Sequence, residues 1–111
     1  PKMDELIEQR PFDYYTTNEL ETLAAATAEH VAKLQQIQQA AQGRLDEVAA
    51  ARQRDMADAR SSEQLDQAQE TYEVECRKAS LVATRCALIE HDRFANTRAA
   101  ALLDATHEEE A

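Results

Sequence analysis

The chain has 111 residues, a net charge of −10 and an apolar share of 43%. Ala supplies 22 of its residues, whereas Leu, Ile, Val and Phe together supply only 19. This composition excludes a compact globule with a deep core, a strand-rich fold and a disulfide-built scaffold. Because Ala, Glu, Gln and Arg are strong helix formers, it predicts long helices that bury a narrow apolar stripe.

Residues 1–15 are predicted to form a separate N-terminal segment, with a short helical turn that ends at Pro11. Three aromatic residues, Phe12, Tyr14 and Tyr15, follow within four positions. They are candidates for docking onto a partner or a second protomer. The alternative is that they cap the open end of a helical hairpin and complete its core, and the sequence leaves both interpretations open.

The first long helix is predicted to span residues 17 to about 60. Thr16 is a favourable N-cap with Glu19 at the N3 position, which together make a capping box. Apolar residues then recur at steps of three and four, as on one face of a helix. The predicted intrachain seam on this helix comprises Leu20, Leu23, Leu34, Ile37, Leu45 and Val48. A helix of this length needs a partner along that face.

A break is predicted at Ser61 and Ser62, where Ser61 can cap a second helix and Gln64 can close its box. The second helix is predicted over residues 62 to about 107, followed by an acidic tail. Since neither Gly nor Pro marks a turn, one unbroken helix is the alternative. The heptad frame slips by three residues at the serines, which favours a hairpin. We therefore expect residues 16–111 to form an all-α, long antiparallel helical hairpin.

The second helix carries a wider apolar face than the first, because apolar residues recur as adjacent pairs seven residues apart. One edge is predicted to complete the intrachain seam and the other to form an oligomer or partner face. The seam edge comprises Leu65, Tyr72, Val82, Ile89 and Leu103, and the partner edge comprises Val74, Leu81, Leu88 and Leu102. Covering both edges predicts a homodimer in which two hairpins pair into a four-helix bundle.

The residues that could carry chemistry are few and favour structural roles. Asp104 and His107 share a helical face, but the further inward carboxylates of a di-metal bundle are missing, so a solvated pair is expected. His30 is predicted to be a satisfied histidine beside the seam. Cys76 and Cys86 are too far apart on one helix to bridge each other, which predicts free thiols packed in the apolar stripe. We expect no catalytic residues, no metal, no cofactor and no enzymatic activity.

The charge and the apolar pattern also limit the partners. An isoelectric point of about 4.6 argues against nucleic acid. No run of 18 apolar residues is present, so no transmembrane segment is predicted, and contact with a membrane surface is possible but not favoured. Free thiols predict a reducing, cytoplasmic environment. The expected function is a non-enzymatic scaffolding module that recognises helices of protein partners through coiled-coil packing.

Residues 50–103 resemble the tip hairpin of sorting-nexin-type BAR domains. The similar features are Arg52 and Arg54, the short turn at Ser61 and Ser62, and Arg85-x-x-Leu88 leading to Leu102-Leu103. This resemblance implies a BAR-like membrane-associated or trafficking module, the main alternative function, although the basic concave face of that family is absent from this acidic chain. A metal-binding helical-bundle enzyme is a more distant third. The sequence leaves open the partner, the pathway and whether the chain is a fragment of a longer coiled-coil protein.

Overall fold

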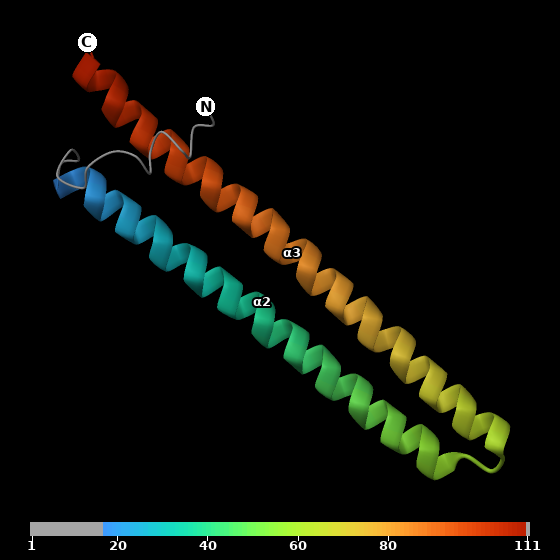
Figure 1. Cartoon of the computed structure of the whole chain (residues 1–111). Helices are drawn as coiled ribbons and strands as arrows, with labels where there is room; N and C mark the ends of the chain where they lie inside the picture. Colours follow the sequence, from blue (N-terminus) through green and yellow to red (C-terminus); the bar gives the residue numbers. More distant parts are fainter. Residues whose placement is uncertain (1–16, 111) are drawn as a thin grey trace. The chain divides into compact units, whose positions relative to one another are not determined.

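The computed structural model describes the backbone of residues 17–110 and the side chains of residues 17–102. Two helices account for nearly all of this part, α2 over Thr17–Asp58 and α3 over Ser62–Glu110, and they pack antiparallel (Figure 1). The predicted all-α antiparallel pair of long helices is therefore confirmed, while the four-helix bundle stays a prediction. The N-terminal segment, with Phe12, Tyr14 and Tyr15, and the side chain of Leu103 lie outside the described residues.

Residues 59–61 connect the helices, where the sequence predicted a break. The Ser61 hydroxyl accepts a hydrogen bond from the backbone N–H of Gln64 at 3.2 Å. The Gln64 side chain accepts one from the backbone N–H of Arg60 at 2.6 Å. The first of these bonds caps α3 at its start, and the second satisfies a backbone donor of the connection. The alternative of one unbroken helix is wrong, because side-chain capping by Ser61 and Gln64 replaces the Gly or Pro that usually ends a helix.

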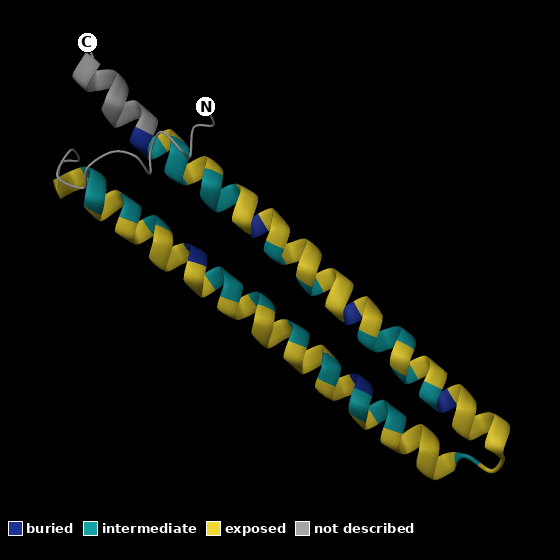
Figure 2. Ribbon diagram, viewed as in Figure 1, coloured by how far each residue is buried: buried dark blue, intermediate teal, exposed yellow. Residues whose placement is uncertain are grey.

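The described chain divides into two compact units, and each contains a segment of both helices. The turn unit is Leu34–Leu88, and the terminal unit combines the chain up to Lys33 with the chain from Ile89 onward. In the turn unit the buried apolar residues are Val48, Ala68 and Ala79. In the terminal unit the buried residues include the polar His30 and Glu90. Buried positions are sparse along both helices (Figure 2).

Burial along α3 recurs every eleven residues. Ala68, Ala79 and Glu90 are buried at this spacing, and Ala83 and Phe94, also eleven apart, are half-buried. Eleven residues in three turns correspond to about 3.67 residues per turn, close to the α-helix itself, whereas a heptad requires 3.5. A heptad frame therefore drifts away from the buried positions, and this drift explains the corrections to the predicted seam.

Candidate protein-interaction surface

Five large apolar side chains of α3 are exposed to solvent, and the four most exposed lie within nine consecutive residues. Leu81 and Leu88 are 69% and 60% exposed, and Val82 and Ile89 are 62% and 59% exposed. Because seven residues make almost two helical turns, the local geometry of α3 aligns Leu81 with Leu88 and Val82 with Ile89. We call these four residues the α3 apolar face. Leu81 lies two residues beyond the buried Ala79, on the opposite side of the helix from the contact with α2.

The exposure of Val82 and Ile89 corrects the prediction that both belong to the intrachain seam. The seam instead passes through their neighbours, the half-buried Ala83 and the buried Glu90. At this point of α3 the eleven-residue recurrence selects Ala83 and Glu90, each one position after the residue that the heptad frame selects. Val82 and Ile89 therefore face away from the seam. Leu65, also predicted in the seam, is 41% exposed. It lies near the start of α3, three residues before Ala68, the first buried residue of that helix.

Leu102 corrects the prediction in the opposite direction. The heptad pattern predicts it on the outward face, but it is 2% exposed and is the most completely buried large side chain described. The eleven-residue recurrence does not account for this burial, because the position eleven residues before Leu102 is the exposed His91. Val74, the remaining residue of the predicted outward face, is half-buried.

The other predicted seam residues lie on the covered side of their helices. Val48 is 5% exposed. The half-buried members are Leu20, Leu23, Leu34, Ile37, Leu45 and Tyr72. The guanidinium of Arg52 lies 4.9 Å from the centre of the Tyr72 ring and its Nε donates a hydrogen bond to Gln69 at 2.9 Å. Half-burial shows that the intrachain pair leaves much of its own seam in contact with solvent.

Charged residues lie directly beside the α3 apolar face. Arg85 precedes Leu88 by three residues, and Asp92 follows Ile89 by three residues, so both share this side of α3. Both side chains are exposed, and within residues 17–102 neither takes part in a hydrogen bond or ion pair. By contrast, Lys78 donates a hydrogen bond to Glu75 at 3.3 Å. The face thus contains Arg85 between its two apolar pairs, and Asp92 lies one turn beyond the second pair.

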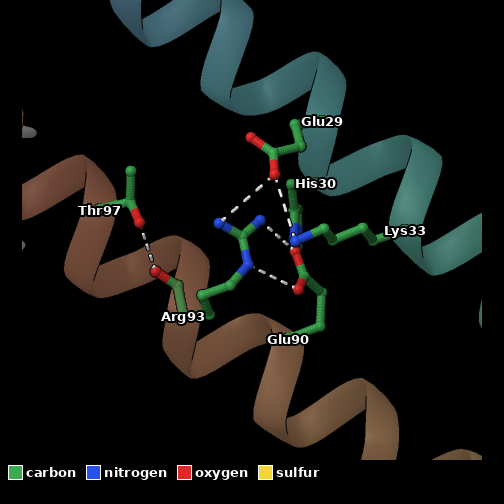
Figure 3. Close-up of polar contacts among 6 residues, drawn as sticks. All are labelled: Glu29, His30, Lys33, Glu90, Arg93 and Thr97. Atoms are coloured by element: carbon green, nitrogen blue, oxygen red, sulfur yellow. Dashed lines mark hydrogen bonds and ion pairs between the residues drawn. The ribbon is translucent and has the colours of Figure 1, made fainter.

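A second feature, a polar cluster, lies in the terminal unit (Figure 3). His30 of α2 is 8% exposed, and its Nδ1 lies 3.2 Å from Oε1 of Glu90 of α3, which is 6% exposed. Arg93 donates hydrogen bonds to both carboxylate oxygens of Glu90, one of them at 2.8 Å from Nε. The Phe94 ring stacks on the His30 ring with centroids 4.3 Å apart. These contacts join α2 and α3 through buried polar atoms.

The electrostatics of this cluster favour an ionised Glu90. The hydrogen bonds from Arg93 lower the pKa of Glu90 from 4.5 to about 2; burial acts in the opposite direction, and the contact with His30 lowers the pKa further. Glu29 lies 4.0 Å from Arg93 and 3.2 Å from Lys33, extending the alternation of charges at the surface. The predicted satisfied histidine at position 30 agrees with this geometry.

Sequence reasoning missed Glu90 and Arg93, because a glutamate beside His91 and Asp92 is typical of a solvated surface. The available signal was the spacing of Glu90 from Ala68 and Ala79, since an eleven-residue repeat assigns Glu90 to the buried side. A second correction concerns Cys86, which is exposed, whereas Cys76 is half-buried; both are free thiols. Cys86 therefore does not pack in the seam.

Metal and membrane sites can be assessed for the part of the chain that is described. Within it, no group of three or more His, Cys, Asp or Glu side chains is placed to hold a metal ion. Among the same residues, no helix has a stretch long and apolar enough to cross a membrane. A small groove of about 90 Å³ in the turn unit is lined by Arg52, Tyr72 and neighbouring residues. What the geometry provides is an exposed apolar surface.

Comparisons with known proteins found no relative of this chain. No family model matches the chain, and neither the curated proteins nor the solved structures contain a significant match.

Proposed function

We propose that this chain is a non-enzymatic interaction module that recognises helices of protein partners through the α3 apolar face. The observation that carries the proposal is the exposure of Leu81, Val82, Leu88 and Ile89, each by 59% or more. Large apolar side chains gathered on one side of a helix are typical of binding surfaces, because covering them removes apolar area from water.

The small intrachain core supports the same proposal. The buried apolar residues of the turn unit are Val48, Ala68 and Ala79, two of which are alanines. The larger Leu81, Val82 and Leu88 of the same unit stay outside that core. The distribution favours a helix whose bulkiest side chains serve contacts with another molecule. Adjacent columns of apolar residues seven apart suit a partner helix, since side chains of one helix fit between those of another at this spacing.

The experiment places a photo-crosslinking amino acid at position 88 of the full chain in its native host. A matched probe at position 38, where Gln38 is exposed on α2, serves as the control. We expect probe 88 to form protein adducts that map to helical segments and that disappear when Leu81→Glu is added. Circular dichroism verifies that each variant retains its helices.

Two results would overturn the proposal. Adducts of equal yield at positions 38 and 88 would show that contact does not select the α3 apolar face. Adducts to lipid alone at position 88, with salt-sensitive co-sedimentation of the protein on anionic vesicles, would favour the BAR-like alternative. The net charge of −10 disfavours that second result, because anionic lipids repel an acidic chain.

A further inference from the structure

We infer that a second copy of this chain binds the α3 apolar face at its Leu88 and Ile89 end, with the two α3 helices antiparallel about a two-fold axis between these residues. The inference rests on the proposed function and names its partner. It is argued from the sequence Arg85-x-x-Leu88-Ile89-x-x-Asp92, the four named residues of which share one side of an unbroken helix.

The pattern is symmetric about its centre in spacing and complementary in charge. In an antiparallel pair with the axis at that centre, Leu88 of each copy meets Ile89 of the other. Arg85 of each copy then meets Asp92 of the other, so two ion pairs flank two apolar contacts. A two-fold interface presents the same patch on both copies, and it therefore requires a patch that complements itself. Residues 85–92 meet that requirement.

Other arrangements of two copies are less favourable. A parallel pair brings Arg85 against Arg85 and Asp92 against Asp92. An antiparallel pair with its axis at Arg85 would match Leu81 with Ile89, but it would place the two Arg85 guanidinium groups together at the centre of an apolar contact. Burying like charges side by side is costly because each loses water without gaining a counter-charge. The axis between Leu88 and Ile89 avoids this cost.

The two charges are available for an intermolecular pair. Neither Arg85 nor Asp92 forms a hydrogen bond or ion pair with any residue from 17 to 102. Some other charged residues are already engaged within the chain, as Arg44 is with Glu47 and Glu75 at 3.2 and 3.1 Å. Arg85 lies between the exposed Leu81 and Leu88, so any helix that covers these residues must supply an acceptor for its guanidinium. Asp92 of a second copy is such an acceptor.

The test measures the mass of the full chain in solution by sedimentation equilibrium over a range of concentrations. We expect the wild type to dimerise. Arg85→Glu and Asp92→Arg should each weaken the dimer by about tenfold or more, because each replaces two attractive pairs with two repulsive ones. The double variant Arg85→Glu/Asp92→Arg should regain dimerisation, since the pairs are restored with their signs exchanged.

Mixing the two single variants gives the sharpest result. A copy with Glu at position 85 keeps Asp92, and a copy with Arg at position 92 keeps Arg85, so both cross-pairs in a mixed dimer are attractive. The mixture should therefore dimerise more strongly than either variant alone. Arg77→Glu and Glu70→Arg are matched controls, because both positions are exposed on α3 outside residues 85–92, and they should leave the mass unchanged.

A wild-type monomer at all concentrations would overturn the inference. So would a dimer that both single variants leave intact, or one that the mixture fails to restore. Failure here is distinct from failure of the proposed function. If the chain is monomeric while the probe at position 88 still captures another protein, only the identity of the partner is wrong; if the probe also captures nothing, both proposals fail.

Discussion

The terminal unit and the turn unit join the same two helices by different means. In the terminal unit, α2 meets α3 through a buried His30, a buried Glu90 and the Arg93 that donates to it. In the turn unit, the buried apolar side chains are Val48 of α2 and the small Ala68 and Ala79 of α3. The comparison shows that a chain poor in large apolar residues can pair its helices either by satisfying buried polar groups or by keeping side chains small.

The two solutions differ in what they specify. Small side chains permit close approach of helices but tolerate sliding, because one alanine packs much like another. A buried carboxylate that lacks its partners is costly, so Glu90 favours the alignment that brings it to His30 and Arg93. We expect the terminal unit to define the alignment of α2 with α3 and the turn unit to add apolar contact.

The largest expected effect comes from removing the centre of the polar cluster. Glu90→Ala leaves the buried His30 and the guanidinium of Arg93 without their shared acceptor. We expect the melting temperature to fall on the order of 10 °C, measured by circular dichroism at neutral pH. Glu70→Ala, at an exposed position of α3, is the control and should change it little. Equal melting of the two variants would show that the cluster does not stabilise the terminal unit.

The stability of the turn unit should depend on the size of its buried side chains instead of on charge. Ala79 is 8% exposed, and Ala79→Leu forces additional volume between α2 and α3. We expect a loss of about 1–3 kcal/mol in the free energy of unfolding, measured by urea titration. Ala50→Leu introduces the same side chain at an exposed position and should be nearly neutral. A stabilised Ala79→Leu protein would contradict the view that small residues are required at this contact.

Acid should weaken the terminal unit through Glu90. The pKa of this carboxyl is lowered from 4.5 to about 2 in the folded state. Its contribution to stability is therefore complete above pH 4.5 and is lost as the pH falls toward 2, with about half gone near pH 3. Urea titrations across this pH range measure the difference in free energy of unfolding between the wild type and Glu90→Gln. A difference that stays constant with pH would show that Glu90 ionisation does not stabilise the fold.

The smallest expected effect is a gain, at the single glycine of the chain. Gly43 lies within α2, in the turn unit, and a methyl group added there would meet no atom within 4 Å. Gly43→Ala should stabilise the protein by about 0.5–1 kcal/mol, because alanine loses less backbone entropy in a helix. Urea titration shows whether the free energy of unfolding rises or falls. A destabilised variant would indicate that position 43 contacts another molecule in solution.

Much of the fold could be predicted from residue types alone. The alternation of apolar and polar residues indicated two long helices, and the serines with Gln64 indicated their connection, because capping depends on a few neighbouring residues. Which residues of α3 form the seam was harder to predict from the sequence. Over the first turns of α3, repeats of seven and eleven residues select similar positions, and they separate only near Val82, where the heptad assignment fails.

The candidate surface was also predicted only in part. Leu81 and Leu88 were predicted on a partner face and are exposed, whereas Leu102 was predicted there and is buried. The polar cluster could not be anticipated from composition, since a carboxylate is usually at the surface and Glu90 is buried only because His30 and Arg93 satisfy it. Pairing of that kind depends on which residues of α2 lie across from α3.

The eleven-residue recurrence has a consequence for how such a chain can vary in length. A matched insertion or deletion of eleven residues in both helices of the turn unit returns every flanking residue to its original side after three complete turns. A change of about seven or eighteen residues does nearly the same, whereas sizes far from a whole number of turns rotate one portion of a helix against the next and disturb its contacts. Related chains are therefore expected to differ in length by segments that make nearly whole numbers of turns in each helix, eleven residues among them, and this rule can guide the alignment of distant homologues.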